Sequence, residues 1–138
     1  MTIGTRVFTG VYPLKVPGPM SSPALLRWKL AFWILLPVVI VASLLPDTSS
    51  LPTTGWDKSN HMLAYLTLSF LGIRAYPSQT GKVLLGLFLY GGLIEVLQSF
   101  MPYRMADYAD MMANSLGLLA GWAMNVMLAK RASAKLNT

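Results

Sequence analysis

Four long apolar runs dominate this chain of 138 residues and limit its possible folds more than any other feature. A membrane-spanning helix needs roughly 20 apolar residues, and about 17 are tolerated. The composition is 54% hydrophobic and only 12% charged, which is typical of membrane proteins and more than a small soluble domain can hide. We therefore expect an all-α bundle with four transmembrane helices. The runs cover about Trp28–Leu45, Ser59–Tyr76, Val83–Phe100 and Ala106–Leu128.

Prolines mark the ends of the first three runs, and the four runs together divide the chain into three parts. Each break disfavours helix at the residue before the proline. Pro37 interrupts the first run. We expect residues 1–27 to be a cytoplasmic segment, rich in Gly and Pro and ordered only where a partner holds it. Residues 28–129 then form the four-helix domain, and residues 130–138 a basic cytoplasmic tail. The breaks are Leu45-Pro46-Asp47, Tyr76-Pro77-Ser78 and Met101-Pro102-Tyr103.

The basic residues are unevenly distributed around the runs. Only Lys58 and Arg104 lie in or beside the first and third loops. By the positive-inside rule, both termini are cytoplasmic and these two loops are external. Charge confined to the flanks of apolar runs indicates topology and attraction to lipid headgroups, not a nucleic-acid interface. The nine residues on the predicted inner side are Arg6, Lys15, Arg27, Lys29, Arg74, Lys82, Lys130, Arg131 and Lys135.

The acidic residues and the single histidine all fall on the predicted outer side. Asp57, His61 and Tyr65 share one helix face, since they are spaced four residues apart. A charged side chain deep in a spanning helix costs around 2.5 to 3.5 kcal/mol to insert, so such groups should face protein or water. We predict one polar pocket at the outer mouth of the bundle. Its members are Asp57, Lys58, His61, Tyr65, Glu95, Gln98, Arg104, Asp107, Asp110 and Asn114.

Structural roles can account for the same residues. His61 can form hydrogen bonds within the bundle, and Glu95 and Arg104 can form a buried ion pair that fixes helix register. Asp110 can cap the last helix, and Asn114 can bond across helices. These structural roles remain alternatives to a functional pocket.

Small residues recur every four positions along the last run. Ala113, Gly117 and Gly121 predict close packing of this helix on a neighbour, and Gly91 and Gly92 of the third run can accept such an approach. The chain has no cysteine, so thiolate metal sites are excluded. The sequence requires no cofactor, and we predict no metal site.

The polar residues also carry a resemblance to a known family. The segments Asp57-Lys-Ser-Asn-His61-Met-Leu-Ala-Tyr65, Glu95-Val-Leu-Gln98, Pro102-Tyr-Arg104 and Asp107-Tyr-Ala-Asp110-Met-Met-Ala-Asn114-Ser-Leu-Gly117 resemble the VanZ-like family of small bacterial membrane proteins. The chain departs from the pattern at Tyr103, where a glycine is expected before the arginine. The family is named after a teicoplanin-resistance protein, so the resemblance implies a bacterial inner membrane and a cell-envelope role. It assigns no reaction.

Three functions are compatible with this pattern, and the sequence leaves enzymatic activity undecided. The first is a non-catalytic protein, either an accessory subunit of a larger membrane complex or a module that binds an anionic headgroup. The second is an outer-leaflet enzyme acting on a phosphorylated or lipid-linked envelope substrate, with His61 or Glu95 as the general acid or base. In that case Lys58 and Arg104 would hold the anion, and the aspartates would orient them or bind a divalent cation. The third, a proton-coupled carrier, is disfavoured because the polar groups stop in the outer half.

Overall fold

The described part of the chain is entirely helical. The computed structural model describes residues 22–45, 57–102 and 108–135, and no strand occurs within these ranges. The expected all-α class is therefore confirmed for them. The elements are α1 (Ser22–Leu44), α2 (Asp57–Ala75), the short 3-10 helix η1 (Pro77–Gln79), α3 (Thr80–Ser99) and α4 (Tyr108–Lys135).

Two helices are longer than the sequence predicted. α1 begins at Ser22, well before the predicted Trp28, and continues through Pro37. Pro23 lies in its first turn, where the missing backbone N–H costs no hydrogen bond. α4 continues to Lys135, into the predicted basic tail, because Ala, Lys and Arg all favour helix.

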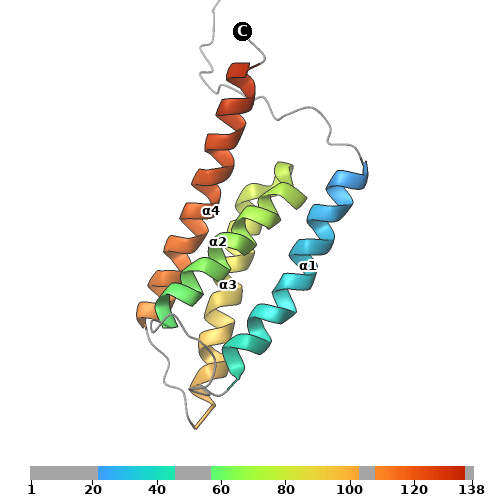
Figure 1. Ribbon diagram of the computed structural model, residues 1–138. Coiled ribbons are helices and arrows are strands. Elements are labelled where there is room, and N and C mark those ends of the chain that lie inside the picture. The colour runs from blue at the N-terminus through green and yellow to red at the C-terminus, as the bar shows by residue number, and fades with distance from the viewer. Residues whose placement is uncertain (1–21, 46–56, 103–107, 136–138) are drawn as a thin grey trace, which may run out of the picture.

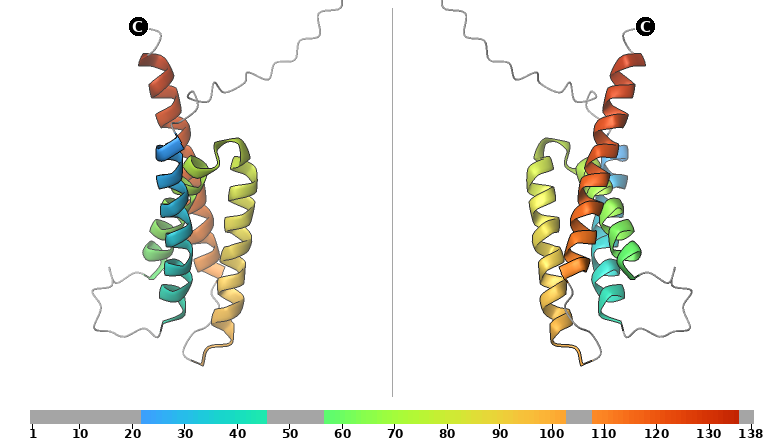
Figure 2. Two further views of the ribbon diagram at one scale, coloured as in Figure 1. Left: turned by 90° about the vertical axis from the view of Figure 1, so that its right-hand side faces the viewer. Right: turned by 90° about the vertical axis from the view of Figure 1, so that its left-hand side faces the viewer.

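The four helices run alternately up and down, as Figure 1 shows. α2 lies between α1 and α4 in this view, and Figure 2 shows that it is inclined to α3. The core of the bundle includes Phe32, Leu68, Leu87, Ile94 and Leu118, so every long helix contributes to it. The last turns of α4 extend beyond the other helices.

Among the described residues, three helices are long and apolar enough to cross a membrane. They span Pro23–Leu44, Pro77–Ser99 and Tyr108–Lys135, the second including η1. α2 is not among them, because polar residues occupy its first turns. Its central residues Tyr65, Leu68 and Ser69 are fully buried, whereas the other three helices expose many large apolar side chains. α2 is therefore the helix that faces protein most.

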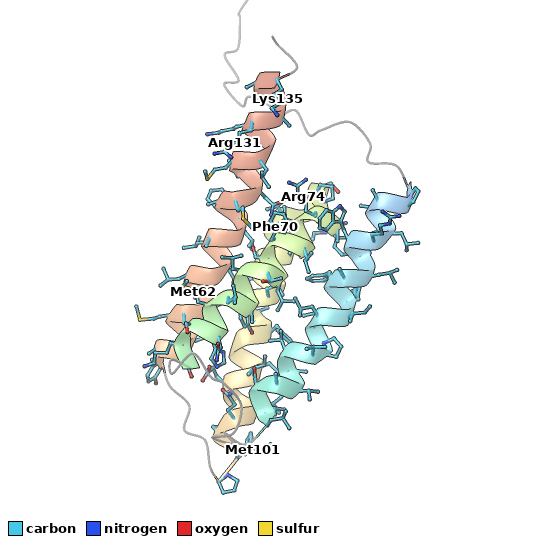
Figure 3. All side chains as sticks on the ribbon, in the orientation of Figure 1. Met62, Phe70, Arg74, Met101, Arg131 and Lys135 are labelled. Atoms are coloured by element: carbon cyan, nitrogen blue, oxygen red, sulfur yellow. The ribbon has the colours of Figure 1, made fainter. Side chains whose placement is uncertain are left out.

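Charge separates the two ends of the bundle. In the described ranges, one end carries Lys58 as its single basic residue. Figure 3 shows Arg74, Arg131 and Lys135 toward the opposite end and Met101 at the end that carries Lys58. We call the Arg74 end the basic end. Its described basic residues are Arg27, Lys29, Arg74, Lys82, Lys130, Arg131 and Lys135.

α2 and α4 pack with their backbones nearly in contact. A Cβ added to Gly117 would overlap Met62 O, and one added to Gly121 would lie 2.5 Å from Leu66 O. Both glycines therefore face α2, with no room for a side chain. Ala113 is buried on the same helix.

Candidate functional site

Buried polar side chains from three helices gather in the half of the bundle opposite the basic end. Each is at most 9% exposed, so none has more than slight contact with the surroundings. They come from the first turns of α2 and α4 and from the last half of α3, which the antiparallel arrangement brings to the same level. We call this group the polar cluster: His61, Tyr65, Glu95, Asp110 and Asn114.

Gly91 lies where the three helices of the polar cluster approach one another. A Cβ at this position would lie 3.1 Å from Tyr65 Oη and 3.3 Å from Asn114 Nδ2. The phenol of α2 and the amide of α4 therefore both reach the same point on α3. Any larger residue at position 91 would press on both polar groups, so the glycine defines one wall of the site.

Two members of the polar cluster lack hydrogen-bond partners among the described residues. These are the Tyr65 hydroxyl and both side-chain polar atoms of Asn114. Tyr65 is 0% exposed and Asn114 is 3% exposed. Most buried polar atoms in proteins are paired, and leaving one unpaired costs about 1–3 kcal/mol. The described residues therefore leave the hydrogen-bonding capacity of these two side chains unused.

The carboxylates of the polar cluster take two different positions. Asp110 Oδ2 lies 3.9 Å from His61 Nε2, at ion-pair distance when the imidazole is protonated. Glu95 lies within electrostatic reach of the Tyr65 hydroxyl. The cluster therefore has a histidine–carboxylate pair between α2 and α4, and a second carboxylate on α3.

Gln98 makes a contact with α1 that the sequence did not suggest. It is 1% exposed, and its Nε2 donates a 2.8 Å hydrogen bond to Ser43 O near the end of α1. The last carbonyls of a helix have no partner within that helix. Gln98 therefore caps α1 with one of the N–H groups of its side-chain amide.

Other residues of the predicted pocket lie at its edge or beyond the described ranges. Lys58 is exposed in the first turn of α2. Asp57 begins that helix, but its side chain lies outside what the structure describes. Arg104 and Asp107 also lie outside the described residues. Within those residues, no group of three or more His, Asp or Glu side chains is arranged to hold a metal ion.

A second polar contact, near the basic end, was not expected from the sequence. Arg74 and Asn125 form a side-chain hydrogen bond between α2 and α4. Ser69 Oγ also donates to Leu118 O across the same pair of helices, at 2.9 Å. The signal for Asn125 was present, because it continues the four-residue spacing of Gly117 and Gly121.

Comparisons with known proteins agree with the resemblance in the polar residues. The family model described as VanZ/LLP1 matches residues 20–129. An uncharacterised protein of Schizosaccharomyces pombe is 32% identical over 120 residues, which are 82% of this chain and 72% of the relative. No solved structure matches the chain. With three helices able to cross a bilayer, the chain is a multi-pass membrane protein, and it belongs to the VanZ/LLP1 family.

Proposed function

We propose that this protein is a non-catalytic membrane module that binds the headgroup of a phospholipid in the polar cluster. The observation that carries the proposal is the pair of buried, unpartnered groups on Tyr65 and Asn114, which meet at Gly91. A ligand oxygen between them would accept a hydrogen bond from each and would remove the cost of leaving them unpaired.

The charges around the cluster favour a headgroup that combines a phosphate with hydroxyl groups. A ring N–H of His61 supplies a donor to phosphate, and Lys58 supplies positive charge at the rim. Glu95 and Asp110 would repel a bare phosphate, but they accept hydrogen bonds from hydroxyl groups. A phosphorylated polyol headgroup matches both the groups that bind phosphate and the carboxylates that accept hydrogen bonds from hydroxyl groups. We include Arg104 among the proposed phosphate-binding groups.

The proposed topology places the polar cluster on the outer side of the membrane. The concentration of basic residues at the opposite end supports cytoplasmic termini by the positive-inside rule. In this arrangement α2 also crosses the bilayer, shielded by α1, α3 and α4, and the bundle has four spans. Location in the bacterial cytoplasmic membrane, with the cluster facing the periplasm, is proposed from the resemblance to the VanZ-like family of small bacterial membrane proteins; the relative in Schizosaccharomyces pombe shows that similar chains also occur in a eukaryote.

Two substitutions with opposite expected effects test headgroup binding. Tyr65→Phe removes an unpartnered hydroxyl, so it should leave the lipid-free protein as stable as the wild type or more stable. If the hydroxyl binds a headgroup, the same change should lower lipid retention roughly fivefold to tenfold. Asn114→Ala should also lower retention. Ser115→Ala is the matched control, because Ser115 Oγ bonds only within its own helix, to Met111 O.

Native mass spectrometry of the untagged protein from its own membrane reads out these variants. A small species that carries phosphorylated polyol lipid, and loses it on Tyr65→Phe, supports the proposal. Retention of that lipid by both variants would refute binding at this cluster. Migration in a large stoichiometric complex without lipid would favour the accessory-subunit role and would also refute the proposal.

The histidine–carboxylate pair favours one second candidate, an outer-leaflet enzyme. His61 beside Asp110 resembles an oriented acid–base group, and Glu95 lies in the same cluster. Glu95→Gln keeps the shape of the side chain and removes its charge. Loss of a lipid-modifying activity with lipid retention and folding intact would establish the enzyme. Unchanged lipid composition of the membrane with this variant would exclude Glu95 as the acid–base group.

A further inference from the structure

A groove between α1 and α3, near the basic end, is separate from the polar cluster. Its volume is about 330 Å³. Phe32, Trp33 and Leu36 of α1 line one side, and Val83, Leu87 and Tyr90 of α3 line the other. The walls are therefore mainly apolar and aromatic, and they belong to two helices that are able to cross a membrane.

The mouth of the groove, by contrast, is polar and positively charged. Tyr76, Gln79 and Lys82 line the groove where the chain passes from α2 into α3. Lys29 Nζ lies 5.4 Å from the centre of the Tyr76 ring. The Tyr76 hydroxyl accepts a 2.9 Å hydrogen bond from Trp33 Nε1, which fixes both rings beside the lysines. Two cations and an aromatic pair thus lie at the end nearest the basic surface.

Gly86 leaves the middle of the groove open. It lines the groove, and a Cβ added there would have no heavy atom within 4 Å. Most of the lining surface is apolar and can pack against a hydrocarbon chain, whereas a water molecule in the groove would find few hydrogen-bond partners. A linear apolar chain with a negative headgroup matches this combination of walls and mouth.

We propose that this groove binds one anionic glycerophospholipid from the leaflet at the basic end. An acyl chain lies along Leu36 and Val83, and the phosphate lies between Lys82 and Lys29. Anionic lipids concentrate near juxtamembrane lysines, and aromatic residues such as Trp33 and Tyr76 favour the headgroup level. This site and the headgroup site proposed for the polar cluster lie at opposite ends, so either can exist without the other.

Filling the groove tests the proposal with a matched control. Gly86→Phe places a ring in the open space, whereas Gly81→Phe adds the same ring to α3 at a position that is also open and does not line the groove. Full-length protein in nanodiscs of phosphatidylglycerol and phosphatidylcholine is released into the mass spectrometer. We expect wild type and Gly81→Phe to retain phosphatidylglycerol preferentially, and Gly86→Phe to retain roughly tenfold less of it.

A charge variant keeps the test decisive if Gly86→Phe perturbs folding. Lys82 is exposed, so Lys82→Gln should fold normally and bind phosphatidylglycerol roughly fivefold more weakly. Because the polar cluster can also hold phosphatidylglycerol, Gly86→Phe should lower retention to the same degree in the Asn114→Ala background as in the wild-type background, which separates the two sites. Equal retention of both lipids by the wild type, undiminished retention in a folded Gly86→Phe, or a second copy of the chain bound in place of lipid would overturn the proposal.

Discussion

Arg74 Nε donates a 2.8 Å hydrogen bond to Asn125 Oδ1, joining α2 to α4 near the basic end. Asn125 also donates from Nδ2 to Gly121 O at 3.0 Å and to Phe70 O at 3.3 Å. The Arg74 guanidinium lies 5.3 Å from the Phe70 ring centre and 6.0 Å from that of Trp28. One arginine therefore holds α1, α2 and α4 together, close to the labelled Phe70 in Figure 3.

Replacing the asparagine should weaken this junction. Asn125→Leu removes the acceptor of a half-buried charged donor, and hydrogen bonds to charged groups contribute about 1.5–3 kcal/mol. We expect a comparable loss in the free energy of unfolding, measured by denaturant titration in detergent micelles. Ser133→Ala, on the same helix, removes only a bond to Ala129 O and serves as the control. Equal stability of the two variants would show that Arg74 does not depend on Asn125.

The two glycines of α4 should tolerate no side chain. Gly117→Ala places a methyl group against Met62 O, and Gly121→Ala places one 2.5 Å from Leu66 O. Overpacking of this kind costs roughly 1–3 kcal/mol, because the helices must separate. Gly92→Ala is the control, since its Cβ would meet only Met111 Cε at 3.6 Å. Thermal unfolding in micelles checks the ranking, and wild-type stability of both α4 variants would contradict it.

Gln98 should contribute to the stability of the end of α1 and have little effect on the stability of the polar cluster. Gln98→Leu keeps the approximate volume and removes the bond to Ser43 O, for an expected loss of about 1 kcal/mol. Hydrogen exchange should speed up in the last turn of α1 and stay unchanged near Asn114. Ser99→Ala is the control, because Ser99 Oγ bonds to Val96 O within α3. Faster exchange at the start of α4 instead would place Gln98 in the cluster.

The absence of cysteine makes the proposed topology directly measurable. Ser78 in η1 is exposed, and Tyr108, at the start of α4, is 91% exposed. We expect Ser78→Cys to react with a membrane-impermeant thiol reagent only from the cytoplasmic side, and Tyr108→Cys only from the opposite side. Labelling of both from one side would mean that α3 does not separate the two positions across the bilayer.

The proline positions allowed the ends of three helices to be predicted closely. α1, α2 and α3 end at Leu44, Ala75 and Ser99, each shortly before a break containing proline. This works because proline acts locally on the backbone of its predecessor. The start of α1 was placed too late because the prediction assigned residues 1–27 to a segment rich in Gly and Pro, whereas Ala24, Leu25 and Leu26 are apolar helix formers and belong to α1.

Side-chain partners were less predictable than helix ends. Spacing placed His61 and Tyr65 on one face of α2, and the structure buries both. Spacing within one helix cannot show which neighbouring helix a side chain faces. The hydrogen bonds from Gln98 to Ser43 and from Arg74 to Asn125 therefore depend on the packing of the whole bundle. Arg74 was interpreted only as a topology signal, although its position beside two aromatic rings gives it a structural role.

The burial of α2 has a consequence for how the protein enters the membrane. α2 is too polar to partition readily into lipid by itself, and the Gly117–Gly121 face that covers it is synthesised some forty residues later. In the proposed four-span topology, stable integration of α2 therefore depends on the arrival of α4, so we expect insertion to be cooperative rather than helix by helix. Nascent chains arrested before α4 should leave α2 accessible to the aqueous phase or held by the insertion machinery.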